Sequence, residues 1–264
     1  MPPLSPLLDK KKIQDLIQDP KISLEIFDTL PSTQDYLHKK KNLQHLQICL
    51  AEDQFQGRGR LNRPWVCPKN RNICLSFCFV FHKQSNELTG LSLGIGIIIA
   101  DILKNLFPTL FPHLKWPNDI YLESKKLGGI LVEINEETSD DCKVVIGIGL
   151  NVNMKDISLL EINQPWTSLE HSLGVSLDRN LLLGHLLPAL VLGLELFEKK
   201  GLTPFLEKWK AYDFLEVKTI SLKRGEEILT GIAHGITPEG YLSLRLPSGE
   251  FKTFSSGDTQ ILKD

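Results

Sequence analysis

A basic, glycine-containing segment lies between two apolar runs, and this pattern most constrains how the chain can fold. Residues 51–65 read Ala-Glu-Asp-Gln-Phe-Gln-Gly-Arg-Gly-Arg-Leu-Asn-Arg-Pro-Trp. The runs at 45–50 and 73–81 are rich in branched and aromatic residues, which predicts a buried strand on each side. The basic segment is therefore expected to be a loop carried between two core strands.

The side chains of this loop suit an anion. Its three arginines, Arg58, Arg60 and Arg63, lie close together, and two glycines beside the first allow a sharp turn or a close approach to a ligand. On the loop alone, a solvated basic hairpin and a nucleic-acid patch remain alternatives. Because three like charges repel, we expect residues 56–63 to be mobile until an anion neutralises them.

Composition limits the class of protein. The chain has 264 residues, 42% hydrophobic and 23% charged, which describes one large globular domain plus a small one. The formal net charge is -2 and the pI about 6.4, so no general positive field attracts nucleic acid or anionic membranes. We therefore expect no sequence-specific DNA binding.

Targeting signals are not evident in the sequence. The first six residues lack a basic region followed by an apolar core, and no later run is expected to reach the ~20 apolar residues of a membrane helix. These patterns predict a cytoplasmic protein with no membrane partner.

The five cysteines are odd in number, and Cys74 and Cys78 should share one face of a strand. This arrangement is a weak hint of zinc. Since no His or Cys pair elsewhere has ligand spacing, we predict no metal held by protein side chains.

The N-terminal half alternates helices and strands. Residues 1–21 predict a loose lead with a short amphipathic helix at 13–17, and 22–27 predict the first strand. Ser32 is a natural N-cap with Asp35 in the first turn of a helix. A hydroxyl at a helix start can cap the helix, and it can also bind a small polar ligand.

The middle of the chain carries two lysine motifs. An apolar helix is expected at 87–107, followed by Lys115-Trp116-Pro117-Asn118-Asp119 and by a strand that begins at Lys126. A strand-end lysine is usually a solvated gatekeeper. Here Gly128 and Gly129 follow it, which would clear the way for a ligand. The antiparallel partner strand is expected at 143–153.

In the C-terminal half, the spacing of apolar residues changes from a helical period to the alternation typical of strands. Thr167-Ser168-Leu169-Glu170 matches a capping box, and Asp178 is a second N-cap. Helices are predicted at 181–199 and 204–212. Strands separated by glycine turns follow, predicting a small β-barrel, at 216–221, 226–234, 240–246 and 250–255. The domains are therefore expected at 1–21, 22–213 and 214–264.

Five motifs together resemble the biotin–protein ligases, also called biotin–[acetyl-CoA-carboxylase] ligases. They are Ser-Thr-Gln at 32–34, Gln-x-x-Gly-Arg-Gly-Arg at 54–60, Lys-Trp-Pro-Asn-Asp at 115–119, Lys-Leu-Gly-Gly-Ile-Leu-Val-Glu at 126–133 and Gly-Ile-Gly-Leu-Asn at 147–151. The resemblance implies an α/β fold of the α+β type. Its mixed-sheet catalytic domain would be related to lipoate ligases and class II synthetases, with an SH3-like barrel after it. No N-terminal DNA-binding domain is expected, so the chain resembles the monofunctional type.

The resemblance also implies the reaction. Biotin would attack ATP to give biotinyl-5'-AMP and pyrophosphate, with Mg²⁺ bridging the ATP phosphates. Biotin would then pass to a lysine of a biotin carboxyl carrier protein, such as an acetyl-CoA carboxylase subunit. The oligomeric state is expected to be monomer or homodimer.

Site residues are carried over motif by motif. Biotin binding is implied for Ser32, Thr33, Gln34, Gln54, Gly57, Arg58, Gly59, Arg60, Lys126 and Gly128. ATP binding is implied for Arg60, Arg63, Lys115, Lys126, Asn151 and Trp166, with Trp166 stacking on adenine. Catalytic roles are implied for Lys126, Arg60, Arg58 and Asp119. Lys126 would neutralise charge between the biotin carboxylate and the α-phosphate, and Asp119 would either assist the incoming lysine or hold a turn.

The chain departs from the family pattern in and near the loop. Gln34 stands where many members have Asn, Leu61 and Asn62 replace the common Arg-Gly, and Pro64 replaces a frequent lysine. Gln offers the same amide one carbon further out. The loop changes bear on how the loop orders and on any dimer face.

Two other functions fit parts of the pattern. A lipoate–protein ligase would use the same adenylation chemistry, although the arginine loop and the barrel argue against it. A non-enzymatic RNA-binding module would use the arginine loop and the barrel, but the acidic net charge is unfavourable.

Overall fold

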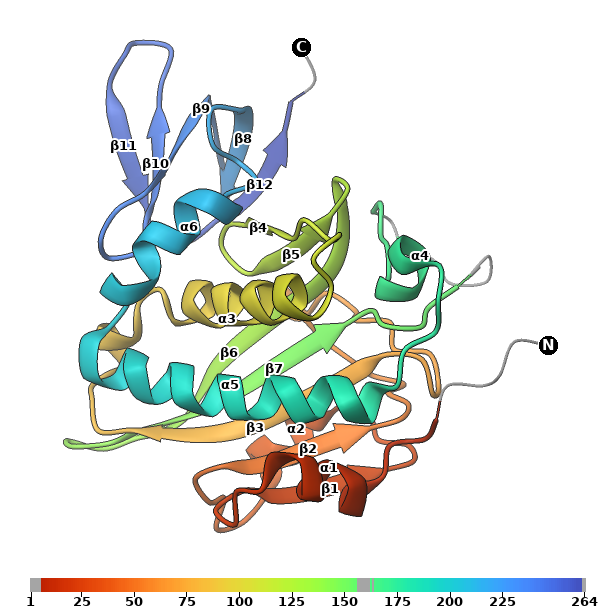
Figure 1. The fold of residues 1–264 in the computed structure, drawn as a ribbon. Helices are drawn as coiled ribbons and strands as arrows, with labels where there is room; N and C mark the ends of the chain where they lie inside the picture. Colours follow the sequence, from red (N-terminus) through yellow and green to blue (C-terminus); the bar gives the residue numbers. More distant parts are fainter. Residues whose placement is uncertain (1–5, 156–161, 163, 263–264) are drawn as a thin grey trace.

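The larger of two β-sheets forms the centre of the molecule. The computed structural model describes residues 6–155, 162 and 164–262, so residues 1–5 of the predicted lead lie outside the described part (Figure 1). The seven-stranded sheet has the order β1-β2-β3-β7-β6-β5-β4, with β1 and β2 parallel and the other neighbours antiparallel. Its strands are β1 Ser23–Phe27, β2 Gln47–Ala51, β3 Ile73–Phe81, β4 His113–Lys115, β5 Asp119–Leu122, β6 Lys125–Glu137 and β7 Cys142–Leu150. The predicted mixed α/β fold is confirmed.

Helices cover both faces of this sheet. Helices α3 (Leu91–Leu106) and α5 (Arg179–Lys200) pack together on one face, and α1 (Lys10–Ile17) packs against α5 (Figure 1). Helix α2 (Thr33–Lys39) contacts β3 and β7 from the opposite face. The alternation of side chains along β3 makes this possible, because Phe77 and Phe79 enter the large core whereas Cys78 enters the small core under α2.

Two helices are apolar enough to span a membrane by length and composition alone. They are Ser85–Leu106 and Arg179–Lys200, so the expectation that no run reaches this length is wrong. Both pack against each other as core helices, and the first also packs against β6. A buried core helix passes the same hydropathy test as a membrane helix, because it too is apolar around much of its circumference.

Several helices of the larger domain are preceded by an N-cap residue whose side chain accepts a backbone hydrogen bond. The Ser32 hydroxyl accepts a hydrogen bond from the Asp35 amide, and the Asp178 carboxylate accepts one from the Asn180 amide, as predicted. Helix α4 (Leu169–Leu173) is N-capped by Ser168 and not by Thr167, the first residue of the predicted capping box. The C-terminal helical part also contains α6, Leu206–Tyr212, preceded by a short 3-10 turn. Short 3-10 turns also lie at Ser85–Leu88 and at Arg60–Asn62. The predicted helix start at residue 87 falls in the first of these turns, and α3 itself begins at Leu91.

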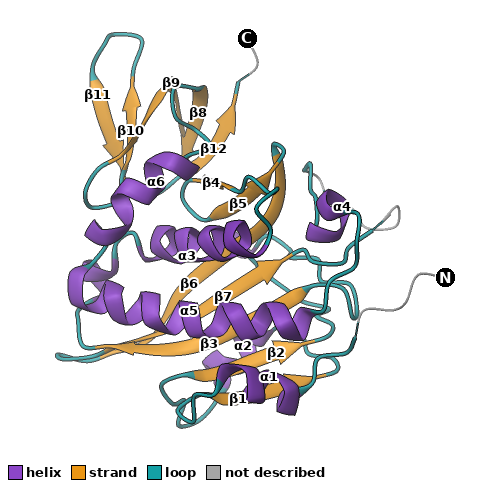
Figure 2. Ribbon diagram, viewed as in Figure 1, coloured by secondary structure: helices purple, strands orange, loops and turns teal. Residues whose placement is uncertain are grey.

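A five-stranded antiparallel sheet forms the C-terminal unit (Figure 2). Its strands are β8 Thr219–Arg224, β9 Glu227–Ile236, β10 Leu242–Arg245, β11 Phe251–Phe254 and β12 Asp258–Ile261, in the order β11-β10-β9-β8-β12. Four of them were predicted, and β12 was missed. Trp116 Nε1 donates to the Gly240 carbonyl at 3.1 Å and Thr259 Oγ1 donates to the Trp116 carbonyl at 3.2 Å. These bonds join the small sheet to the turn between β4 and β5.

Candidate functional site

A cavity of about 700 Å³ lies on the α2 side of the large sheet, between the arginine loop and the C-terminal unit. Most of the residues assigned from the sequence line it. They are Ser32, Thr33, Gln34, Gln54, Arg58, Gly59, Arg60, Arg63, Lys115, Asp119, Lys126, Asn151 and Trp166. The structure therefore brings the separate motifs to one place.

The strand register builds the floor of this cavity. Cys74, Gly149, Gly129 and Asp119 are partners across four neighbouring strands. The next row contains Ser76, Gly147 and Leu131. All of these residues line the cavity. Because their side chains are mostly small, the floor leaves room for a ligand to lie against the sheet.

Trp65 covers part of that floor. A Cβ on Gly149 would lie 2.2 Å from the Trp65 ring, so the glycine is required for the indole to rest on the sheet. Lys126 Nζ lies 5.7 Å from the centroid of the same ring. Neither Trp65 nor Gly149 was assigned a role from the sequence, although Gly149 belongs to the motif at 147–151 and Trp65 ends the basic segment 51–65.

Two glycines assigned to biotin binding do not line the cavity. A Cβ on Gly128 would lie 2.8 Å from the Gly149 carbonyl oxygen, and one on Gly57 would lie 2.5 Å from the Trp65 carbonyl oxygen. Their absence of a side chain allows backbones to approach one another. Gly129, in contrast, faces the cavity beside Lys126 and Asp119.

A hydroxyl and amide cluster closes one end of the cavity. Gln54 Oε1 accepts from the Thr33 amide at 2.7 Å and from Thr33 Oγ1 at 3.0 Å. Thr33 Oγ1 also lies 2.9 Å from Ser76 Oγ. The start of α2 and residue 54 therefore present hydrogen-bonding groups to a neutral polar ligand.

Gln34 is held mainly by protein groups. Its amide nitrogen donates to Glu133 Oε2 at 2.9 Å and to the Val145 carbonyl at 3.0 Å, and its oxygen accepts from Ser76 Oγ at 3.0 Å. A Cβ on Gly147 would lie 2.7 Å from this oxygen, so the glycine makes room for the glutamine. The side chain is buried and rests against Gly147 of the cavity floor.

Lys126 and Asp119 form an ion pair at the centre of the site. Lys126 Nζ lies 2.8 Å from Asp119 Oδ1, and the Lys126 side chain is only 15% exposed. The pair fixes the direction of the ammonium, which a free lysine side chain would not maintain. Lys115 lies nearby and is partly buried, and loss of hydration lowers the pKa of its ammonium.

The predicted nucleotide residues lie at the other end. Trp166 pairs with Lys126 in an isolated β-bridge, and both line the cavity. Asn151 uses its side chain to accept from Asn72 Nδ2 and to donate to the Thr167 carbonyl, at 3.2 and 3.0 Å. These bonds order the segment that carries Trp166.

The arginine loop is a tight hairpin. The Trp65 amide donates to the Gly57 carbonyl and the Gly59 amide donates to the Arg63 carbonyl, and each hydrogen bond is 2.8 Å long. At the tip, Leu61 and Asn62 both have φ of 55°, as hairpin turns of the primed type require. Below the hairpin, residue 54 pairs with residue 67, which continues the ladder. We call residues 57–59 and 63–65 the stem, and 60–62 the tip.

A disulfide fastens the end of the hairpin to the sheet. Cys67 is bonded to Cys74 of β3, whereas Cys49, Cys78 and Cys142 are free and buried. The zinc hint from Cys74 and Cys78 is therefore wrong, because Cys74 is joined to a different partner. Among the described residues, no group of three or more His, Cys, Asp and Glu side chains has metal-binding geometry.

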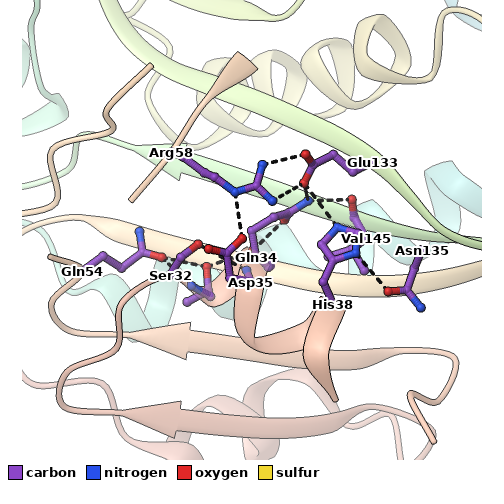
Figure 3. Close-up of polar contacts among 11 residues, drawn as sticks. Ser32, Gln34, Asp35, His38, Gln54, Arg58, Glu133, Asn135 and Val145 are labelled. Carbon is purple, nitrogen blue, oxygen red and sulfur yellow. Dashed lines mark hydrogen bonds and ion pairs between the residues drawn. The ribbon is translucent and has the colours of Figure 1, made fainter. Parts of the chain in front are cut away.

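Each arginine of the hairpin has different partners (Figure 3 shows those of Arg58). Arg58 contacts the carboxylates of Asp35 and Glu133, and Arg63 contacts Asp258 of β12. Arg60 contacts Asn118 Oδ1 at 3.3 Å and the Gly257 carbonyl at 3.5 Å. In the described part of the chain, Arg60 has no carboxylate at ion-pair distance. Mutual repulsion is therefore no reason for mobility at Arg58 or Arg63, which carboxylates already neutralise.

The C-terminal sheet is part of the cavity wall, which the sequence did not indicate. Lys223, Ile228, Asp258 and Gln260 line the cavity together with the hairpin. Only the three-dimensional docking of the small sheet brings them there. Glu133, which holds Arg58, has a sequence signal, because it alternates with Gly129 and Leu131 on one face of β6.

Comparisons with known proteins agree with this geometry. Residues 26–151 match the Biotin/lipoate A/B protein ligase family, and residues 218–261 match the Biotin protein ligase C terminal domain. The chain is 36% identical to the bifunctional ligase/repressor BirA of Escherichia coli strain K12, over 90% of this chain and 74% of the relative. The chain belongs to the biotin protein ligase family. The biotin–[acetyl-CoA-carboxylase] ligase of Paracoccus denitrificans is 30% identical, over 76% of this chain and 84% of that relative.

A solved biotin protein ligase has the same fold. The Aquifex aeolicus biotin protein ligase in complex with biotin and ATP has a TM-score of 0.78 and 28% identity, covering 92% of this chain and 99% of that one. The mixed-sheet domain and the SH3-like C-terminal domain are thus those of a biotin protein ligase. These relatives favour neither the lipoate nor the RNA-binding alternative.

Proposed function

We propose that this chain is an ATP-dependent biotin–protein ligase that works through biotinyl-5'-AMP in the cavity described above. One observation carries the proposal. A single cavity joins the hydroxyl and amide groups of Thr33 and Gln54 to the cations Lys126, Arg60 and Lys115. Adenylation of biotin needs both ends, since a neutral ureido ring must be bound while a carboxylate and a phosphate are brought together.

The polar end would bind the ureido ring. Ser32, Thr33 and Gln54 offer hydroxyl and amide groups beside a floor of small residues. The hairpin, with Gly59 and Arg60, would lie over the biotin tail. The contacts of Gln34, Gly57 and Gly128 are with other protein groups. These residues would therefore support the residues that contact biotin rather than contact biotin themselves.

The cationic end would perform the first half-reaction. Lys126 would contact the biotin carboxylate and the α-phosphate and neutralise the charge that increases in the transition state. Arg60, Arg63 and Lys115 would bind the phosphates, and Trp166 would stack on adenine near Asn151. Mg²⁺ would be bound through ATP phosphates, which supply the hard oxygen ligands that it prefers.

The second half-reaction would transfer biotin to a lysine amine. The acceptor would be a biotin carboxyl carrier protein, such as an acetyl-CoA carboxylase subunit. Asp119 pairs with Lys126 in this structure, which supports a positioning role for Asp119 before transfer. We place the enzyme in the cytoplasm as a monomer or homodimer, and its net charge of -2 supports a role without sequence-specific DNA binding.

Biotin-dependent ATP–pyrophosphate exchange tests this function. We expect exchange with biotin and ATP, and only background exchange with lipoate or without an acid. A carrier domain should then receive biotin from the preformed adenylate. Lipoate-dependent exchange of equal rate would assign the cavity to lipoate, and no exchange with either acid would remove adenylation as the function.

A further inference from the structure

Arg58 belongs to the loop expected to grip the ligand anion, yet its guanidinium is already engaged. Its Nε donates to Asp35 Oδ1 at 2.8 Å, while Nη1 and Nη2 donate to the two oxygens of Glu133 at 2.6 and 2.8 Å (Figure 3). This bidentate pairing is the strongest geometry that arginine and a carboxylate form. Its hydrogen bonds with Glu133 and Asp35 raise the pKa of Arg58, so the cation is permanent.

The two carboxylates come from two different elements beside the cavity. Asp35 lies in the first turn of α2, directly after Ser32 and Thr33. Glu133 lies on β6, the strand that carries Lys126 and Gly129. Arg58 therefore ties the stem of the hairpin to the wall beside the polar end and to the strand that holds the catalytic lysine.

Glu133 is itself held in place. Besides Arg58 it accepts from Gln34 Nε2, and His38 Nε2 lies 3.2 Å from the same oxygen. Burial opposes ionisation of Glu133, but the hydrogen bonds from Arg58 and Gln34 outweigh it and lower the pKa of the carboxyl. The carboxylate is thus charged at neutral pH and fixed on several sides.

We propose that Asp35 and Glu133 are positioning residues of the ligase reaction, which clamp the stem of the hairpin through Arg58. Arg60, which has no carboxylate partner among the described residues, is left to meet the ligand anion. The proposal rests on the function stated above and deepens it. With the stem fixed, closure over biotin would involve the tip alone. The clamp stabilises the binding-competent arrangement before biotin arrives, which reduces the cost of ordering the lid on binding.

Glu133→Gln tests the clamp directly. It keeps the volume of the side chain but removes the charge from both contacts to Arg58. We expect the KM for biotin to rise about ten-fold in pyrophosphate exchange, since a smaller fraction of molecules has the stem in place. The kcat should stay within about three-fold of wild type because the groups that contact the reacting atoms are unchanged.

Amide hydrogen exchange supplies a readout independent of activity. The Gly59 and Trp65 amides close the stem by donating to Arg63 and Gly57 carbonyls. They should exchange faster in Glu133→Gln, without ligand, than in wild type. Glu25→Gln is the matched control, because Glu25 is 30% exposed, like Glu133 at 29%, and pairs with Lys40 away from the cavity. This control should leave both the KM and the stem amides unchanged.

Two further variants separate charge from geometry. Arg58→Lys keeps a cation but cannot make three directed contacts, so it should behave like Glu133→Gln. Asp35→Asn removes the charge from the single contact to Arg58 Nε while keeping an acceptor oxygen, so the rise in KM should be smaller. This variant tests the clamp if Glu133→Gln does not fold. In the double variant of Arg58→Met with Glu133→Gln, the KM should equal that of Arg58→Met alone, as expected for coupled residues.

The outcomes are distinct. A fall in kcat with unchanged KM would overturn the clamp, because Arg58 would then act on the transition state. Unchanged KM and unchanged stem exchange would also overturn it. Absence of biotin-dependent exchange in wild type would instead reject the proposed function, and amide exchange in the variants would still decide whether the clamp exists.

Discussion

The floor and the lid of the cavity are held by different forces. The floor is a set of residues on neighbouring strands, where backbone ladders place Gly129 beside Gly149 and Asp119. The lid is a hairpin with few backbone bonds, and its position depends on ion pairs made by Arg58 and Arg63. Strand register is insensitive to any one side chain, whereas a lid held by charged contacts can be released by a single substitution. The floor is therefore suited to fixed chemistry and the lid to closure.

The largest effect is expected on the floor, at Lys126. Lys126→Met keeps most of the aliphatic stem but removes the ammonium. Loss of one buried contact to developing charge commonly costs about 2.7–4 kcal/mol, so adenylate formation should fall by roughly a hundred- to a thousand-fold. Transfer from preformed biotinyl-AMP should suffer less, since two separate anions no longer have to be brought together. Single-turnover assays of the two half-reactions measure this difference.

Lys125→Met is the matched control for that experiment. Lys125 is the neighbouring lysine on β6 and is not part of the cavity wall. The control should retain near-wild-type activity in both steps. Equal losses in the two lysine variants would show that charge near β6, rather than the position of Lys126, matters. Near-wild-type pyrophosphate exchange in Lys126→Met would remove it from the mechanism.

A smaller effect is expected at the tip of the lid. Arg60→Met should reduce pyrophosphate exchange by roughly ten- to a hundred-fold, because the contacts of Arg60 at 3.3 and 3.5 Å fix its cation less firmly than the 2.8 Å ion pair fixes Lys126. Exchange of the stem amides should stay as in wild type, since the Arg58 contacts are intact. Kinetic assays measure the loss of pyrophosphate exchange, and amide hydrogen exchange on the same preparation measures the protection of the stem. Faster stem exchange in Arg60→Met would show that stem and tip do not act separately.

The same contrast explains what the sequence could predict. Apolar patterns placed the strand at 73–81 and its neighbours, because periodicity reports which face is buried. The motifs placed Lys126, Thr33 and Gln54 at one cavity. Alternation along β6 places Glu133 on the face that carries Gly129, but it does not identify Arg58 as its partner, because any carboxylate at the right distance would serve.

Other parts depended on tertiary contacts too. The strand β12 (Asp258–Ile261) is short and follows a glycine turn, so its alternation covers too few residues to be recognised. The pairing of Cys67 with Cys74 depends on where the hairpin returns to the sheet. The 213–214 domain boundary stays a prediction, and one hydrophobic core includes residues from both sheets.

Asp258→Asn should have a modest effect. It removes the ion pair between the C-terminal sheet and Arg63, whose side chain is 64% exposed. Exposed pairs usually contribute about 0.2–1 kcal/mol, so pyrophosphate exchange should change by no more than about five-fold. The difference from wild type should shrink at high salt, because ions screen the wild-type pair. A large, salt-independent loss would mean that Asp258 contacts a substrate rather than only the lid.

The smallest effect is expected at Leu61, where only the backbone of the tip is concerned. Its φ of 55° is left-handed, which costs an ordinary residue roughly 1–2 kcal/mol but costs glycine little. Leu61→Gly should therefore stabilise the folded tip. Since glycine also gives the open chain more freedom, the net gain should be at most about 1 kcal/mol.

The measurement is the Arg63 amide, whose bond to the Arg60 carbonyl closes the tip. It should exchange up to about five-fold more slowly in Leu61→Gly, the factor that corresponds to about 1 kcal/mol. Leu61→Ala is the control, because it removes the exposed side chain but keeps the Cβ and hence the strain. Leu61 is 71% exposed, so loss of its side chain alone should change little. If alanine and glycine slow the exchange equally, side-chain contacts rather than the left-handed backbone determine how firmly the tip closes.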